Sequence, residues 1–205
     1  PSPNAVAKAP LPPLRPVPQT PSGPPPRLVV SELMADPLLV DDPAGEYVEV
    51  VNLSSTTVRL ADLGFLLPSG KTVCPERPSA PLLLPGAVLV ATPLGTGPAE
   101  ARLRGLRLPN AAGRIELLWR GKIVDVAQWH RKWPWPKAKP GRALERIAPA
   151  SDGRQGASWR RSTTALRGIE RGSPGVVTWP PAQKRPSRTP GCPARQEGAG
   201  GGLEP

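Results

Sequence analysis

Four acidic residues lie within an eleven-residue stretch between two apolar segments. They are Asp36, Asp41, Asp42 and Glu46. Hard cations such as Ca²⁺ bind about six to eight oxygen atoms, which loops supply from carboxylates and backbone carbonyls. The spacing matches no EF-hand loop, and Asp-Pro and Asp-Asp-Pro also form turns. The stretch is therefore a candidate calcium site, with solvent-exposed turn residues as the alternative.

A second stretch, residues 129–139, combines tryptophan with basic residues. Its aromatic and cationic side chains are Trp129, Arg131, Lys132, Trp133, Trp135, Lys137 and Lys139. Aromatic faces beside cations bind single-stranded nucleic acid, sugars and acidic polymers. Tryptophans in a proline-rich loop can also fold back onto the domain, because three exposed indoles would form an apolar patch. The stretch is either a ligand or partner surface or a structural loop with a basic rim.

Little in the sequence points to catalysis. His130 is the only histidine, and no serine or cysteine nucleophile is identifiable beside it and its nearest acidic neighbour, Asp125. A lone histidine also lacks a second ligand for zinc, so we expect a surface residue. Glu46 and Glu49 fall on opposite faces of a strand and cannot act as paired carboxylates. We assign no catalytic residue, expect no cofactor other than the candidate calcium, and expect the protein not to be an enzyme.

These candidate sites depend on β-strands for their positions. Within residues 46–53, Val48 and Val50 point to one side and the residues between them to the other, which is the period of a strand. If Glu49 faces the interior, it needs a partner such as an arginine or a backbone amide. We assign it a structural role, and we expect Asn52 to hold the following turn with its side chain.

Other segments repeat the strand pattern, and none has the pattern of an amphipathic helix. We expect strands at residues 28–34, 58–60, 63–67, 87–91, 114–119, 123–129 and 142–147. Arg120-Gly121 is a two-residue connection that favours a tight hairpin between two of them. Residues 93–107 are rich in Gly, Pro and Arg and predict a long loop. The sequence predicts an all-β domain.

Proline and glycine divide the chain into three parts. The 205 residues include 32 prolines and 21 glycines, concentrated at the ends. Residues 1–27 are expected to form a disordered or polyproline-II tether, and residues 180–205 a disordered tail. Residues 28–179 are long enough to fold around one hydrophobic core.

Location and redox state are open from the residues alone. The chain begins with proline rather than methionine, so we expect a mature form whose secretory signal would already have been removed. No run of 18 apolar residues predicts a membrane span. Cys74 and Cys192 either form a disulfide in an oxidising compartment or stay two separate thiols.

Charge is uneven along the chain, whose net charge is +11. Residues 28–101 carry nine acidic and three basic side chains, whereas residues 102–171 carry 17 basic and five acidic ones. The molecule would be polarised if these halves lay on different faces, but strands of a layered β domain interleave. A basic half favours polyanions as partners, with binding that weakens as salt rises.

Several segments, in order, resemble the lamin tail domain family, an immunoglobulin-like β-sandwich of nuclear lamins and many bacterial surface proteins. They are residues 32–37 (ELMADP), 46–52 (EYVEVVN), 58–65, 84–90, 108–117, 124–129, 144–146, 159–162 and 172–175. The resemblance covers about 145 residues. Phe65 stands where the family usually has tryptophan, and the Trp, Lys and Pro content of residues 129–140 is unusual for it.

The resemblance implies an immunoglobulin-like β-sandwich located outside the cytoplasm, in the periplasm, at the cell surface or secreted. It also implies a non-catalytic binding or structural module that contacts a protein or a cell-envelope polymer. Because a fold does not dictate a function, a second hypothesis stays open. In that alternative, the basic half and the tryptophan-rich stretch bind nucleic acid or another polyanion.

Overall fold

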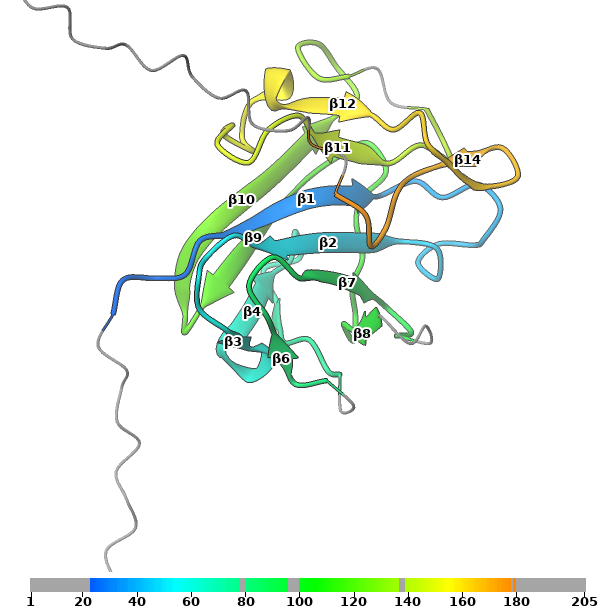
Figure 1. Cartoon of the computed structure of the whole chain (residues 1–205). Coiled ribbons are helices and arrows are strands. Elements are labelled where there is room, and N and C mark those ends of the chain that lie inside the picture. Colours follow the sequence, from blue (N-terminus) through cyan, green and yellow to red (C-terminus); the bar gives the residue numbers. More distant parts are fainter. Residues whose placement is uncertain (1–22, 78–79, 96–99, 137–138, 178, 180–205) are drawn as a thin grey trace, which may run out of the picture.

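Strands are the main regular secondary structure of the described residues (Figure 1). The structure is a computed structural model that describes residues 23–77, 80–95, 100–136, 139–177 and 179. Among these residues, the only helices are two single 3₁₀ turns, Leu60–Asp62 and Gly156–Ser158. No helix in the described part is long and apolar enough to cross a membrane. The all-β prediction is confirmed.

The larger sheet has six strands in the order β12-β11-β1-β2-β7-β8. Their bounds are β1 Leu28–Met34, β2 Tyr47–Asn52, β7 Val88–Thr92, β8 Glu100–Arg102, β11 Leu144–Arg146 and β12 Trp159–Arg161. β8 pairs in parallel with β7, whereas the other pairs are antiparallel. The prediction of an uninterrupted loop over residues 93–107 is wrong, because residues 100–102 join the sheet despite their glycine-rich and proline-rich surroundings.

The second sheet has four strands in the order β10-β9-β4-β5, and two small ribbons complete the structure. The sheet contains β10 Lys122–His130, β9 Ala112–Trp119, β4 Leu63–Leu66 and β5 Thr72–Val73. The ribbons pair β3 Val58–Arg59 with β6 Leu82–Leu83, and β13 Ala165–Arg167 with β14 Glu170–Arg171. Figure 1 shows β10 and β9 crossing behind β1 and β2. The predicted hairpin is confirmed, with Trp119 opposite Lys122 across the Arg120-Gly121 turn.

The main hydrophobic cluster takes side chains from both sheets. Val48 and Val50 of β2 belong to it, together with Phe65 of β4 and Leu117 of β9. All seven residues of β1 are buried because both faces of this strand are covered. A small second cluster, with Tyr47, lies on the other face of the six-stranded sheet. Each of the two sheets contains strands from the acidic half and strands from the basic half, so the halves do not form separate layers.

Several sequence expectations lie outside the described residues. They concern the tether up to residue 22, the tail from residue 180, Lys137 and Cys192. Cys74 is an exposed free thiol in the described part of the chain.

Candidate functional site

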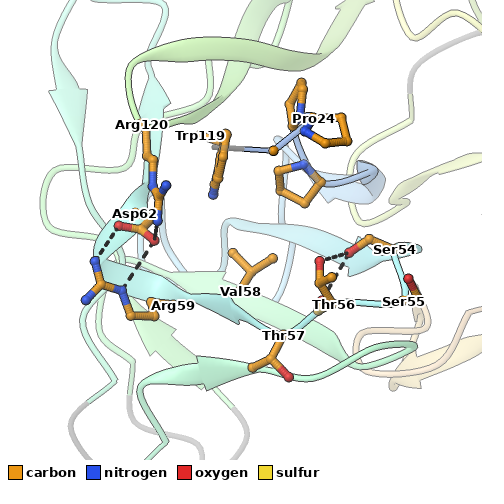
Figure 2. Close-up of a pocket in the computed structure, with 13 residues that line it drawn as sticks. Pro24, Ser54, Ser55, Thr56, Thr57, Val58, Arg59, Asp62, Trp119 and Arg120 are labelled. Carbon is orange, nitrogen blue, oxygen red and sulfur yellow. Dashed lines mark hydrogen bonds and ion pairs between the residues drawn. The ribbon is translucent and has the colours of Figure 1, made fainter. Parts of the chain in front are cut away.

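A groove of about 760 Å³ opens beside the first described residues (Figure 2). Residues 23–26 line one side, and residues 54–59, which lead from β2 into β3, line another. Asp62, Trp119 and Arg120 complete the lining. Most of the lining surface is apolar, with a few polar groups, which is the usual composition of a ligand site.

An ion-pair network holds the tryptophan end of the groove. The Arg120 guanidinium stacks on the Trp119 indole, 4.5 Å from the ring centroid, and donates to Asp62 at 3.0 Å. Arg59 donates to the same carboxylate at 2.9 Å. Both arginines lower the pKa of Asp62, with the Arg59 hydrogen bond as the largest cause. Arg120 has φ 50° and Gly121 φ 76°, as a tight hairpin turn requires.

The hydroxyl-rich wall is held by Asn52, which confirms the predicted turn role. The Asn52 amide donates to the carbonyls of Thr56 at 2.8 Å and Leu83 at 3.0 Å. Its carbonyl accepts the Ser54 N–H at 3.0 Å. The fixed backbone presents the side chain of Thr57 at the groove (Figure 2). Because residues 54–57 and Trp119 are far apart in the chain, no sequence pattern indicates that they meet.

Trp129 is not part of any exposed surface, and that part of the prediction is wrong. Its side chain is only 3% exposed, and it belongs to the main hydrophobic cluster. The indole N–H donates to the Pro109 carbonyl at 2.8 Å. The ring lies against Gly113, where any Cβ would overlap it. Its place near the end of β10 points the side chain into the core.

The rest of the tryptophan-rich stretch divides between surface and core. Trp133 is 91% exposed, and Lys132 and Lys139 are exposed with it. Trp135 is partly buried and packs on the main cluster. Arg131 is exposed and donates to Asp36 at 2.9 Å. One indole and two lysines of the predicted surface therefore face solvent, and Arg131 lies there already paired with an acid.

The structure adds two arginines to this basic region. Arg142 and Arg161 line a small hollow together with Lys139 and His130. The imidazole Nδ1 of His130 accepts the Lys132 N–H at 2.8 Å. His130 is partly exposed and does not pair with Asp125. We call Lys132, Trp133, Lys139, Arg142 and Arg161 the basic patch.

The four acidic residues of the candidate calcium site differ in burial and in the groups that they contact. Asp36 and Asp42 both accept from the Asn110 amide, at 2.9 and 3.0 Å. Glu46 is buried and accepts the Leu108 N–H at 2.8 Å, and burial raises its pKa to about 7. Asp41 is exposed. No three His, Cys, Asp or Glu in the described ranges lie together as metal ligands would.

No family model, curated protein or solved structure matches this chain. The site is therefore interpreted from its own geometry. The groove has a volume of about 760 Å³, and the basic patch contains Trp133, whose side chain is 91% exposed. These two regions are the candidate sites.

A row of three buried glutamates crosses the six-stranded sheet on the face away from the main cluster. Glu32 of β1 lies opposite Glu49 of β2 and Glu145 of β11 in the strand register. The side chains are 1–3% exposed. We call this row the glutamate ladder. The sequence indicates an interior carboxylate only at Glu49, because the strand register that brings the three glutamates together depends on the fold.

Residues 172–175 cover part of the glutamate ladder and supply several of its hydrogen bonds; we call them the closing segment. The Ser173 hydroxyl donates to Glu32 at 2.6 Å, and the Ser173 N–H does so at 2.8 Å. The Gly175 N–H donates to Glu49 at 2.7 Å, which is the backbone-amide partner that the sequence called for. A Cβ added at Gly172 would overlap the Tyr47 hydroxyl and lie 3.0 Å from a Glu32 oxygen, so a side chain does not fit there.

Burial governs the protonation of the ladder. It raises the pKa of Glu49 to about 7, against hydrogen bonds from Ser31 and Gly175 that lower it. Burial also raises the pKa of Glu32, while hydrogen bonds from Ser173 and Tyr47 oppose the rise. Arg160 donates to Glu145 at 3.0 Å. Glu49 is therefore partly protonated near neutral pH.

Proposed function

We propose that this chain is a non-catalytic binding module of the lamin tail type, an immunoglobulin-like β-sandwich that works outside the cytoplasm and contacts a cell-envelope polymer or a protein. Two sheets that share one core support the sandwich assignment. The segments of the family resemblance also fall on successive elements: EYVEVVN on β2, the hairpin arms on β9 and β10, and the L-E-R sequence on β11. Location outside the cytoplasm rests on that resemblance.

The groove is the observation that carries the binding role. It combines an indole with serine and threonine side chains over a volume of about 760 Å³, enough for a sugar or a short peptide segment. Aromatic residues at the centre of such sites provide much of the binding free energy. The ion pairs of Asp62 keep this end of the groove in place before a partner arrives.

Co-sedimentation with purified peptidoglycan sacculi tests this role. We expect the full chain to sediment at 500 mM salt, and Trp119→Ala to bind about tenfold more weakly or worse, as for a central aromatic anchor. Leu84→Ala, at a side chain that is 56% exposed outside the groove, is the matched control. Wild-type binding by the Trp119 variant would exclude the groove as the site.

The basic patch favours a second function, binding of nucleic acid or another polyanion. Trp133 is 91% exposed, so the faces of its indole ring are open to a stacking partner. Stacking of a base on such an indole contributes about 1–3 kcal/mol, and the neighbouring cations attract phosphates. Arg131 is not counted among these cations, because its charge is already paired with that of Asp36.

Fluorescence anisotropy with a single-stranded DNA oligomer tests the second function. We expect affinity to fall steeply from about 50 to 200 mM salt, and Trp133→Ala to weaken binding by about fivefold or more. Lys122→Ala, at an exposed lysine of the β9–β10 hairpin, controls for general charge. Binding that resists salt, or that ignores Trp133, would argue against this function.

A further inference from the structure

The groove contains hydrogen-bonding groups without a partner inside it. Figure 2 draws no hydrogen bond from Trp119, Ser55 or Thr57 to another residue that lines the groove. An extended chain without internal hydrogen bonds, such as polyproline II, offers carbonyl oxygens to donors of this kind. Aromatic-lined grooves with donors at their edges are the usual docking sites of proline-rich segments.

One wall of the groove is already built from proline. Pro24, Pro25 and Pro26 line it directly after Gly23. Figure 2 shows Pro24 on the side of Trp119 away from the Arg120 guanidinium. Arg120 covers one face of the Trp119 ring at 4.5 Å, so the slot between indole and prolines lies on the other side. An incoming proline ring could pack between the free face of the indole and the proline rings of this wall, as in other aromatic-lined grooves that bind proline-rich segments.

The chain carries a matching segment close by in sequence. Residues 10–18 read PLPPLRPVP and contain five prolines. Four residues, 19–22, separate this segment from Gly23 at the groove, a tether of at most about 14 Å. A tether of that length gives the segment an effective concentration in the millimolar range at its own groove.

We propose that residues 10–18 dock in the groove of the same chain, between Trp119 and the wall formed by residues 54–57. Even a segment with sub-millimolar intrinsic affinity would then occupy the groove most of the time. The docked segment competes for the groove with the outside partner, and this competition rests on the proposed function. The arm thereby lowers the apparent affinity of the module for that partner.

Indole signals in a nitrogen–proton NMR spectrum of the labelled full chain test the docking. The chain has six tryptophans, and Trp119→Phe identifies the signal of Trp119. The arm variant carries Pro12→Ser, Pro13→Ser and Pro16→Ser. The tail variant, Pro180→Ser, Pro181→Ser and Pro186→Ser, removes as many prolines from the other end as a control.

We expect the Trp119 signal to shift in the arm variant and to stay in place in the tail variant. A synthetic peptide of residues 8–20 at millimolar concentration should move it back. An unchanged Trp119 signal in the arm variant would overturn the docking. A wild-type signal that changes on dilution from about 500 to 20 μM would overturn the same-chain source, because a second copy would then be the donor.

Partner binding separates this inference from the proposed function. If the arm occupies nine grooves in ten, the arm variant should bind sacculi about tenfold more tightly than wild type. Equal affinity of the two would exclude competition. Loss of sacculus binding in Trp119→Ala, together with an unchanged NMR signal in the arm variant, would leave the binding role standing and remove only the docked arm.

Discussion

Two groups of buried charges lie on opposite faces of the six-stranded sheet, and they are neutralised in different ways. Toward the second sheet, Arg146 of β11 donates to Asp125 of β10 at 2.8 Å and stacks on Trp159, 5.1 Å from the ring centroid. On the other face, Arg160 donates to Glu145 of the glutamate ladder. Between the sheets, the buried carboxylate is paired with a buried cation. On the outer face, Glu32 and Glu49 instead accept hydrogen bonds from hydroxyl groups and from backbone N–H groups of the closing segment.

The ion pair also joins the two sheets. Asp125 accepts the Val30 N–H of β1 at 2.7 Å, and Arg146 donates to the Val126 carbonyl at 3.0 Å. Burial raises the pKa of Asp125, while Arg146 is the main influence that lowers it. The Trp179 indole donates to the Arg146 carbonyl at 2.7 Å. This network therefore depends on Arg146 more than on any other side chain.

Removal of the cation should produce the largest effect. We expect Arg146→Met to lower the free energy of unfolding by about 3–5 kcal/mol, because Asp125 is left buried without its partner. Urea denaturation followed by circular dichroism measures the loss. The double variant Asp125→Asn with Arg146→Met should recover part of it. A loss below about 1 kcal/mol would show that the pair is not the dominant electrostatic contact.

The second largest effect should be that of pH on the free energy of unfolding, through the glutamate ladder. Glu49, with a pKa of about 7, and Glu32, whose pKa is raised from 4.5, bind more protons in the folded than in the unfolded chain. Buried Glu46, also at about 7, acts in the same direction. Stability should therefore fall as pH rises from about 4.5 to 7 and then level off, with up to about 3 kcal/mol from Glu49. Urea denaturation at pH 5.0 and 7.5 measures the difference, and greater stability at pH 7.5 would contradict it.

Replacement of one ladder carboxyl should sharpen this result. Glu49→Gln removes an ionisable group but leaves an oxygen that accepts the Gly175 N–H. We expect the variant to be about 1–2 kcal/mol more stable than wild type at pH 7.5, and little changed at pH 5.0. Glu76→Gln, at a half-exposed carboxylate paired with Arg104, is the matched control and should show no such dependence. If the stability of the Glu49→Gln variant changed with pH as much as that of wild type, the pH dependence would have to come from other groups.

The smallest effect concerns the closing segment. Ser173→Ala deletes the hydroxyl that donates to Glu32 but keeps the backbone N–H bond. We expect a loss of about 1 kcal/mol, the usual net contribution of a hydrogen bond. Ser55→Ala, at an exposed hydroxyl, should be neutral in the same denaturation measurement. A larger loss of stability in Ser55→Ala than in Ser173→Ala would contradict a stabilising role for the Ser173 hydroxyl.

Local patterns predicted the features that depend on neighbouring residues. The alternation in β2, the tight β9–β10 hairpin and the turn held by Asn52 all follow from a few adjacent side chains. Burial alone indicated that Glu49 needs a donor, with an arginine or a backbone amide as the two options. The donor itself, Gly175, is 126 positions away, and only the fold identifies it.

Features that depend on distant residues escaped sequence analysis. Trp129 and Trp133 share one short stretch, yet one is 3% and the other 91% exposed, because only the first lies in a strand that faces the core. The parallel pairing of β8 was hidden by its irregular surroundings. The groove joins three segments from different parts of the chain, so no single motif marks it.

The closing segment also constrains the order in which the molecule can be made. Ser173 meets Glu32 across 141 positions, so the outer side of the first strand stays uncovered until nearly the whole domain is available. A nascent or translocating chain therefore passes through a long stage in which its early acidic strands have no late partner. Truncation upstream of residue 173 would leave the product permanently at that stage.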